Sequence, residues 1–307
     1  KKPTILKPYS ECRKIFSAND CARSPVPAIR IWRTLNPCFR TFARTTRTSE
    51  CEAIIKEVMK TTKDSMNEKH DWASGDLGNL YFQKGMYEDA LELVLLSKET
   101  AEKHNDFLGV AKRNGQLGQI YLDMGKIEDA NTSFDEQIKY YEDKHITKHM
   151  PDALSNLGEI HLRIGKFDKS FDFFSKSNSI AKELNARYPQ TAALGNMGVI
   201  HLIRGKFEDA VMIFKKVLVI DTEIGDKKRI SQSYGNLGLS YKELRKYDLA
   251  LESYTKQLNI CETIGFKLGI STANNNFATA YNKIGQFNKA LSCLDISLTI
   301  SREMGNQ

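Results

Sequence analysis

The sequence predicts an all-α fold in which antiparallel helix pairs stack on one another, and three periodic features support this prediction. An anchor, most often Asn-Leu-Gly, recurs every 40 residues with its central residue at positions 77, 117, 157, 197, 237 and 277. A turn residue follows each anchor at 85, 125, 165, 205, 245 and 285, and a helix-ending residue at 105, 145, 185, 225, 265 and 305. A fixed period of this size indicates a stacked repeat array.

The period also decides the domain organisation. A globular chain of 307 residues would suggest about two domains. Repeats bury their apolar faces against their neighbours, however, so we expect one continuous elongated core. Hydrophobic residues make up 41% of the chain and charged residues 27%, which is typical of a folded protein. No stretch reaches the roughly 18 consecutive apolar residues that a membrane span needs.

Residues 1–50 form a separate basic, Pro- and Arg-rich arm. They carry eleven Lys and Arg against three acids, so the remaining 257 residues have a net charge of −1 and show no basic stripe for nucleic acid. Residues 22–49 contain no acidic residue. Beyond Pro27, the apolar residues from Ile31 to Phe42 and the basic residues from Arg33 to Arg47 would lie on opposite sides of a helix. This predicts a basic tail packed on the first repeat, a transit peptide, or a segment that contacts a membrane or nucleic acid. A further alternative is an inhibitory segment that folds into the protein's own groove.

The cysteines favour an intracellular, cytoplasmic location, with import into an organelle as the alternative that the arm suggests. Four cysteines lie in or next to the arm, at separations of 9, 17 and 13 residues, none of which matches a zinc knuckle. Cys261 and Cys293 fall on apolar helix positions and are expected to be small buried residues. A reducing compartment is the simpler interpretation.

The repeat array is expected to cover residues 51–307. A capping box at Ser49–Glu52 begins a helix over residues 51–65, which we interpret as a half-repeat that covers the first full unit. Six units of 40 residues then start at about residue 71. Each unit has a small residue where its two helices approach closely, at Ala90, Ala130, Ser170, Ala210, Ala250 and Ala290.

The residues Leu117, Gly118, Tyr121, Gly125, Ile127, Ala130 and Phe134 show the order in which this unit resembles the tetratricopeptide repeat. The resemblance covers residues 71–307 in six copies, and the 40-residue length is similar to the long-helix subclass of Partner-of-Inscuteable-type scaffolds and kinesin light chains. It implies a right-handed superhelical solenoid of antiparallel helix pairs. Its concave wall is made by the first helix of each pair, and it holds an extended or helical segment of a protein partner.

On that wall, the polar residue of the anchor repeats in every unit. An amide offers both a donor and an acceptor, so a row of amides can pair with a partner's backbone; this predicts contacts by Gln116, Asn156, Asn196, Asn236 and Asn276. The alternative is that these amides form only local hydrogen bonds. An apolar spot is expected at Val199, Ile203 and Leu239, with burial against the next helix as its alternative.

No motif for an enzyme is present: there is no phosphate-binding loop and no nucleophile elbow. His161 and His201 replace a Tyr in the repeat and are expected to pack as aromatic rings. We therefore predict a non-enzymatic interaction scaffold without a cofactor or metal. The alternative is a regulatory array of a longer signalling or enzymatic chain, suggested by a sequence that begins at Lys1 and ends at Gln307 without a polar helix to cover the last repeat.

Overall fold

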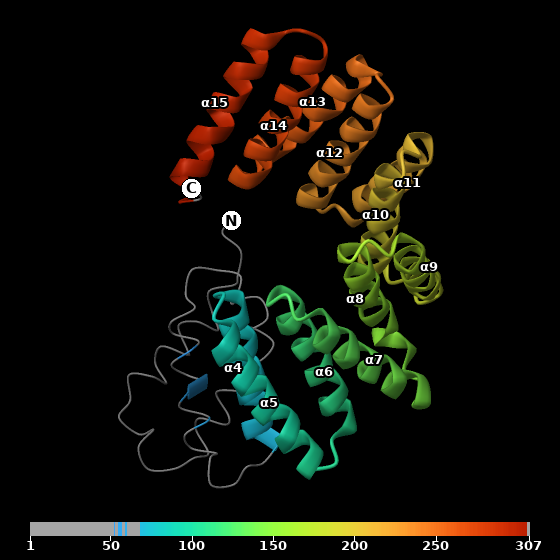
Figure 1. Ribbon diagram of the computed structural model, residues 1–307, viewed down its shortest axis with the longest axis vertical. Helices are drawn as coiled ribbons and strands as arrows, with labels where there is room; N and C mark the ends of the chain where they lie inside the picture. The colour runs from blue at the N-terminus through green and yellow to red at the C-terminus, as the bar shows by residue number, and fades with distance from the viewer. Residues whose placement is uncertain (1–51, 53–54, 57–58, 60–67, 306–307) are drawn as a thin grey trace, which may run out of the picture. The chain divides into compact units, whose positions relative to one another are not determined.

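The computed structural model describes residues 52, 55, 56, 59 and 68–305, so the arm and most of the predicted half-repeat 51–65 lie outside the described residues. The chain forms two compact units that divide between Lys144 and His145. The described residues confirm the all-α prediction: they form twelve α-helices, packed as six consecutive pairs, and no strand (Figure 1).

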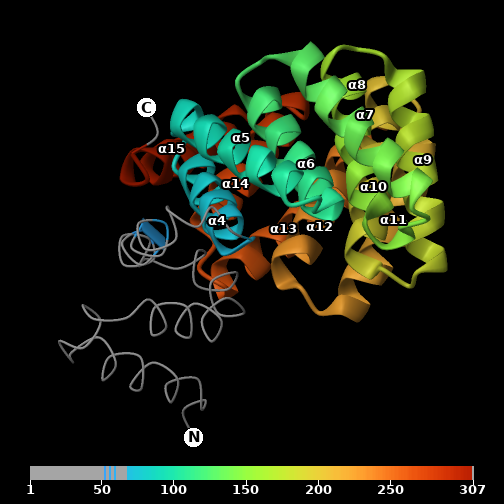
Figure 2. The same ribbon diagram turned by 90° about the horizontal axis from the view of Figure 1, so that it is seen from below.

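The first unit contains α4 (Glu68–Gln83), α5 (Tyr87–Lys103), α6 (Phe107–Asp123) and α7 (Ile127–Asp143). The second contains a short 3-10 helix (Thr147–His149) followed by α8 (Met150–Arg163), α9 (Phe167–Glu183), α10 (Arg187–Ile203), α11 (Phe207–Ile224), α12 (Lys227–Glu243), α13 (Tyr247–Thr263), α14 (Lys267–Lys283) and α15 (Phe287–Glu303). Figures 1 and 2 show α8 to α15 following one another as pairs.

The predicted turn residues all adopt the left-handed conformation. In five of the six pairs the turn between the two helices is made by a glycine, and Arg245 makes it in the fifth pair, with a φ of 58°. A side chain in this region meets the following carbonyl oxygen, which costs roughly 1–2 kcal/mol. Arg245 therefore makes the one strained turn among these six.

A glycine of the first helix and a ring of the second helix form the centre of most pairs. Phe134, Phe174, Phe214 and Tyr254 are 0% exposed. A Cβ added at Gly118 or Gly198 would lie 2.7 Å from the ring opposite, which is closer than real Cβ contacts. In the last pair Ala278 replaces the glycine and the smaller Leu294 replaces the ring, so the two changes compensate.

The second unit begins with a shortened helix. The period would start α8 at residue 147, as α10, α12 and α14 start at 187, 227 and 267, but the α-helix begins at Met150 after one 3-10 turn. Pro151 explains the delay. In a helix beginning at 147 its ring would clash with the carbonyl of residue 147, whereas proline is tolerated in the first turn, where it now lies.

The described residues before α4 cover the first pair. Ile55 is 3% exposed and packs with Ala73, Leu77 and Leu80 of α4. Glu52 accepts hydrogen bonds from Lys56 at 2.7 Å, from Lys84 and from the Tyr81 hydroxyl at 3.0 Å. The hydrogen bonds from Lys56 and Lys84 lower the pKa of the Glu52 carboxyl from 4.5 to about 2.

Candidate functional site

The predicted ladder residues of the second unit occupy equivalent positions on its first helices. Asn156, Asn196, Asn236 and Asn276 lie on α8, α10, α12 and α14, and each is half-buried. These first helices also approach one another directly, α8 with α10 and α12 with α14. Gln116 lies on α6 of the first unit, so the candidate site is built here from the second unit alone.

Hydrogen bonds divide the ladder into two groups. The Asn276 amide donates to the Gln257 Oε1 at 3.2 Å, and the Gln116 Oε1 accepts from the Arg113 guanidinium at 2.8 Å. Among the described residues, the side chains of Asn156, Asn196 and Asn236 form no hydrogen bond. Asn276 and Gln116 thus form the local hydrogen bonds that the alternative interpretation expects. The other three amides, of Asn156, Asn196 and Asn236, form none among the described residues.

The residue nineteen positions before each amide explains the difference between Asn236 and Asn276. For Asn276 this residue is Gln257, whose oxygen accepts the amide hydrogen. For Asn236 it is Val217, which is 4% exposed and offers no acceptor. Asn236 and Asn276 therefore differ in their hydrogen bonding because Val217 of α11 offers no acceptor and Gln257 of α13 does.

Gly195, on α10 beside Asn196, lacks the packing role of the equivalent glycines. A Cβ added at Gly235 would lie 2.8 Å from the Gln257 Nε2, and one at Gly115 would collide with Gln137. A Cβ at Gly195 would meet nothing within 4 Å. Glycine inside a helix costs about 1 kcal/mol relative to alanine, and the packing of the described residues gives no reason for this one. A close approach by another molecule is a known use of such a residue.

The predicted apolar residues lie on the same two helices but differ in exposure. Ile203 at the end of α10 is 51% exposed. Val199 is half-buried and packs against the cluster of Ala210, Phe214 and Leu237. Leu239 on α12 is half-buried. Only Ile203 is therefore largely open to solvent, and part of Val199 is used for packing between helices.

The charged neighbours of this surface are paired with one another. Arg163 donates to Glu159 at 2.7 Å within α8, and the Lys242 ammonium lies 3.2 Å from the Glu243 carboxylate at the end of α12. These pairs flank Gly195, Asn196 and Ile203 along the chain. Because each charge already has a partner, a ligand gains little from meeting any single one of them.

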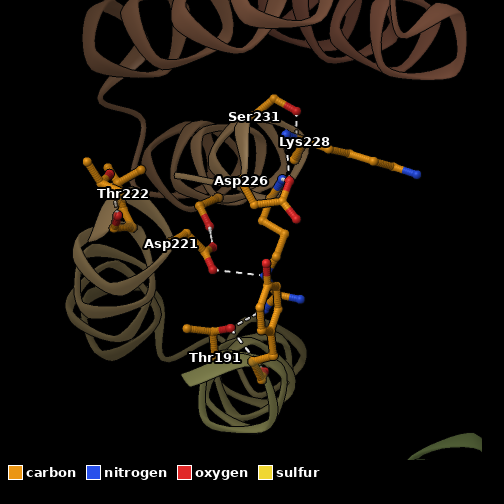
Figure 3. A network of polar contacts seen from close by, with 10 residues as sticks. Thr191, Asp221, Thr222, Asp226, Lys228 and Ser231 are labelled. Atoms are coloured by element: carbon orange, nitrogen blue, oxygen red, sulfur yellow. Dashed lines mark hydrogen bonds and ion pairs between the residues drawn. The ribbon is translucent and has the colours of Figure 1, made fainter. Parts of the chain in front are cut away.

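A buried polar network joins α10, α11 and α12 (Figure 3). Asp221 of α11 is 1% exposed and accepts from the Arg229 Nε at 2.9 Å and from the Ser233 hydroxyl at 2.8 Å. Arg229 also donates to the Thr191 hydroxyl of α10, and its guanidinium lies 5.6 Å from the Tyr188 ring centre. The network therefore fixes α10 and α12, which carry Asn196 and Asn236, against the helix between them.

This network occurs in a single repeat among those described. At the position of Asp221 the other units have Ala101, Tyr141, Ala181, Cys261 and Ser301. At the position of Arg229 they have Gly109, His149, Pro189 and Gly269. The interface between the fourth and fifth pairs therefore contains a buried ion pair whose equivalent positions in the other described repeats hold no such pair.

The two histidines of the repeat pack as rings, as predicted. His161 stacks on Phe173 at 5.3 Å between ring centres, and His201 meets Phe171 edge-on at 5.4 Å. Burial lowers the pKa of His201, and Asp209 opposes this shift only in part. The described residues contain no group of three or more His, Cys, Asp or Glu placed to hold a metal ion, and none of their helices is long and apolar enough to cross a membrane.

Sequence reasoning identified the amides but missed Gly195 and the Asp221 network. A glycine at 195 looks like those at 115 and 235 until the opposite residues are compared, Val217 against Gln137 and Gln257. The signal for the network was the single Asp at a position that is otherwise small or aromatic. Interpreting it required knowing that Thr191 and Arg229, 38 residues apart, are neighbours.

The sequence pattern of the tetratricopeptide repeat matches residues 116–181, 149–223, 190–263 and 229–303. These matches overlap and together span more than half of the 307 residues. The chain belongs to the tetratricopeptide repeat family. The predicted similarity to the long-helix subclass stays a prediction. No curated protein matches this tetratricopeptide repeat chain.

Solved structures share the arrangement of its helices. The apo form of RapI has a TM-score of 0.71 at 10% identity, with 90% of this chain and 99% of that chain covered. BtubC (BKLC) from P. vanneervenii has a TM-score of 0.62 at 20% identity, covering 72% and 93%. The anaphase-promoting-complex hetero-tetramer Cut9–Hcn1 has 0.65 at 13% identity, covering 91% of this chain and 49% of that chain. At such identities the likeness shows the fold alone.

Proposed function

We propose that this tetratricopeptide repeat protein is a non-catalytic scaffold that binds a segment of a protein partner along the first helices of its second unit. The observation that carries the proposal is the set of three half-buried amides, on Asn156, Asn196 and Asn236, that have no hydrogen-bond partner among the described residues. A half-buried amide without a partner is costly to shield further, so a ligand that covers it must supply a hydrogen bond. A peptide backbone supplies donors and acceptors in alternation.

The partner's contact is centred on α10. Gly195 lets a main chain or side chain approach the helix closely, Asn196 next to it provides hydrogen bonds, and Ile203 two turns further adds exposed apolar surface. The segment that suits this surface has a backbone amide pair over Asn196 and an apolar side chain toward Ile203. The paired charges on α8 and α12 limit the role of net charge in recognition.

The fixed spacing of α10 and α12 also favours binding of the partner segment. A ligand that bridges Asn196 and Asn236 gains from both only if the two helices already stand at the right separation. The Asp221–Arg229 ion pair, anchored to Thr191, holds that separation in the free protein. Pre-organisation by the network is therefore part of the proposed mechanism, although none of its members is proposed to touch the partner.

The test compares two double variants of the full chain for partner capture from a native extract. Asn196→Ala with Asn236→Ala removes two ladder amides, and Asn259→Ala with Asn288→Ala removes two exposed amides on second helices as a matched control. At about 1 kcal/mol for each hydrogen bond, we expect the ladder variant to lose at least tenfold in partner affinity. Its thermal midpoint should match that of the control, because no hydrogen bond within the chain is lost.

Two results would contradict the proposal. If the ladder variant melts well below the control and still retains its partners, the amides are structural. If both variants retain the same partners with the same affinity, the first helices of the second unit are not the binding surface.

A further inference from the structure

The last helix has an apolar face that no described residue covers. Phe287, Leu291, Leu294 and Leu298 of α15 are 62%, 60%, 47% and 48% exposed. Their spacing of four, three and four residues places them in one stripe along the helix. No charged residue interrupts the stripe. A contiguous stripe of four large apolar side chains differs from the single exposed apolar residues that are normal on a protein surface.

The same face is covered on every earlier second helix of this unit. The face of α9 packs with α10, the face of α11 with α12 and the face of α13 with α14. At the position of Leu294, Phe174, Phe214 and Tyr254 are 0% exposed, and they share clusters with residues of the following helix: Met197 and Ile200, Leu237, and Phe277 and Ala280. The α15 stripe therefore continues an interface that the unit forms three times.

The partner of each such interface has one chemical character. It is an amphipathic helix with apolar residues three and four positions apart, such as Tyr234, Leu237 and Tyr241 on α12 or Phe277, Ala280 and Tyr281 on α14. A helix of this kind satisfies its own backbone groups, so it can cover an apolar stripe without leaving unpaired N–H or C=O groups. An isolated extended strand satisfies none of its backbone N–H and C=O groups internally.

We propose that the open face of α15 is a docking surface for one amphipathic helix of a protein partner, seated as the first helix of a following pair sits on α13. Asp295 and Arg302, both exposed and seven residues apart, line one edge of the stripe. The docking helix is expected to place a basic and an acidic residue at the same spacing opposite them. This surface belongs to a second helix, so it is separate from the first-helix surface proposed above, and either proposal can fail without the other.

The probe for the test is a helix-stapled peptide with the sequence Lys267–Lys283, because α14 covers the corresponding face of α13. Leu251 and Leu258 of α13 are equivalent to Leu291 and Leu298 of α15. The peptide contains no acidic residue, so it tests the apolar stripe and not the two charges. The full chain is titrated against the labelled peptide and fluorescence anisotropy is measured. We expect saturable binding that weakens at least tenfold when Leu291→Asp and Leu298→Asp are combined. Both leucines are largely exposed, so the variant should keep its circular dichroism spectrum and its thermal midpoint.

Two further variants of the protein test whether the peptide binds at the α15 stripe. Met212→Asp changes a side chain on α11 that is 57% exposed but outside the stripe, and it should leave peptide binding unchanged. A chain extended after Gly305 by a copy of residues 266–283 should no longer bind the peptide, because the added helix occupies the face. Binding that is absent, or that persists in the double-Asp variant or the extended chain, would overturn the proposal.

Sedimentation equilibrium of the full chain tests another occupant, a second copy. We expect the wild-type chain and the double-Asp variant to have the same mass at micromolar concentration. A wild-type dimer that the two Asp substitutions convert to a monomer would assign the face to self-association and overturn the assignment to a partner's helix.

Discussion

Replacing Gly195 by alanine should stabilise the protein while weakening its binding to a partner. Alanine is better than glycine in a helix interior by about 1 kcal/mol, and the added Cβ would meet no atom within 4 Å. The full gain should therefore appear as stability, equivalent to a factor of about five in the folded-to-unfolded ratio. Few substitutions at a proposed binding surface are expected to stabilise the chain, so the sign of the change is informative.

Gly235→Ala is the matched control for this substitution. It brings the same gain in helix propensity at the equivalent position of α12, but its Cβ would lie 2.8 Å from the Gln257 Nε2. Gln257 is 4% exposed and is hydrogen-bonded to Asn276, so it cannot move away freely. The collision should cancel the gain, leaving the stability unchanged or lower by up to about 1 kcal/mol.

Native-state hydrogen exchange is the assay, because it reports the stability of α10 and α12 separately in an array that need not unfold in one step. For Gly195→Ala, the slowest amides of α10 should exchange about fivefold more slowly than in the wild type. Faster exchange in α10 would show that the glycine is needed by the fold. Unchanged partner affinity in the stabilised variant would refute the inferred close approach of a ligand at Gly195.

Four other experiments test separate features of the structure. Arg229→Ala should cost about 3 kcal/mol in urea unfolding because it strands a buried carboxylate, and adding Asp221→Ala should recover part of that loss; a double variant as unstable as the single one would contradict this. Tyr254→Phe removes a buried hydroxyl that has no hydrogen-bond partner among the described residues and should raise stability by about 1 kcal/mol, so a lower thermal midpoint would show that the hydroxyl has a partner. Arg245→Gly relieves a left-handed residue and should stabilise by a similar amount in the same melting experiment. The pKa of Glu52 is lowered from 4.5 to about 2. Its contribution to the free energy of unfolding, about 0.5 kcal/mol for a partly exposed ion pair, is therefore complete above pH 4.5 and is lost as the pH falls toward 2. Glu52→Gln should be less stable than the wild type at about pH 6, and the melting curves of the two proteins should converge near pH 2.

The fold was predictable because the same residue types recur at the same positions of each repeat. Left-handed turn residues, small residues at close contacts and aromatic residues beneath glycines recur every 40 residues, and a packing rule that is ambiguous in one unit is clear in six. Arg245 can be identified from the sequence as the exception among the turns, because the other five turns have a glycine there. The shortened α8 could not be predicted from the period, because it depends on where the Pro151 ring would clash and therefore on where the helix starts.

The candidate site was predictable in its residue type but not in its detail. Four asparagines look equivalent in the sequence, yet Gln257 accepts a hydrogen bond from Asn276 while Val217 offers Asn236 no acceptor. Such differences arise from residues on the second helix of the preceding pair, which lie at the interface between pairs. Periodicity alone treats the units as identical, so it cannot rank Asn236 above Asn276.

The exchange of a glycine and a ring for Ala278 and Leu294 has a consequence for how this array could have grown. Duplication or recombination that joins the first helix of one pair to the second helix of another separates residues that depend on each other. A hybrid pair with Ala278 above Tyr254 would place a methyl group inside a ring, and one with Gly238 above Leu294 would leave a cavity. A break between whole pairs after residue 105, 185 or 265 keeps these partners together, whereas a break at the turn within a pair separates them.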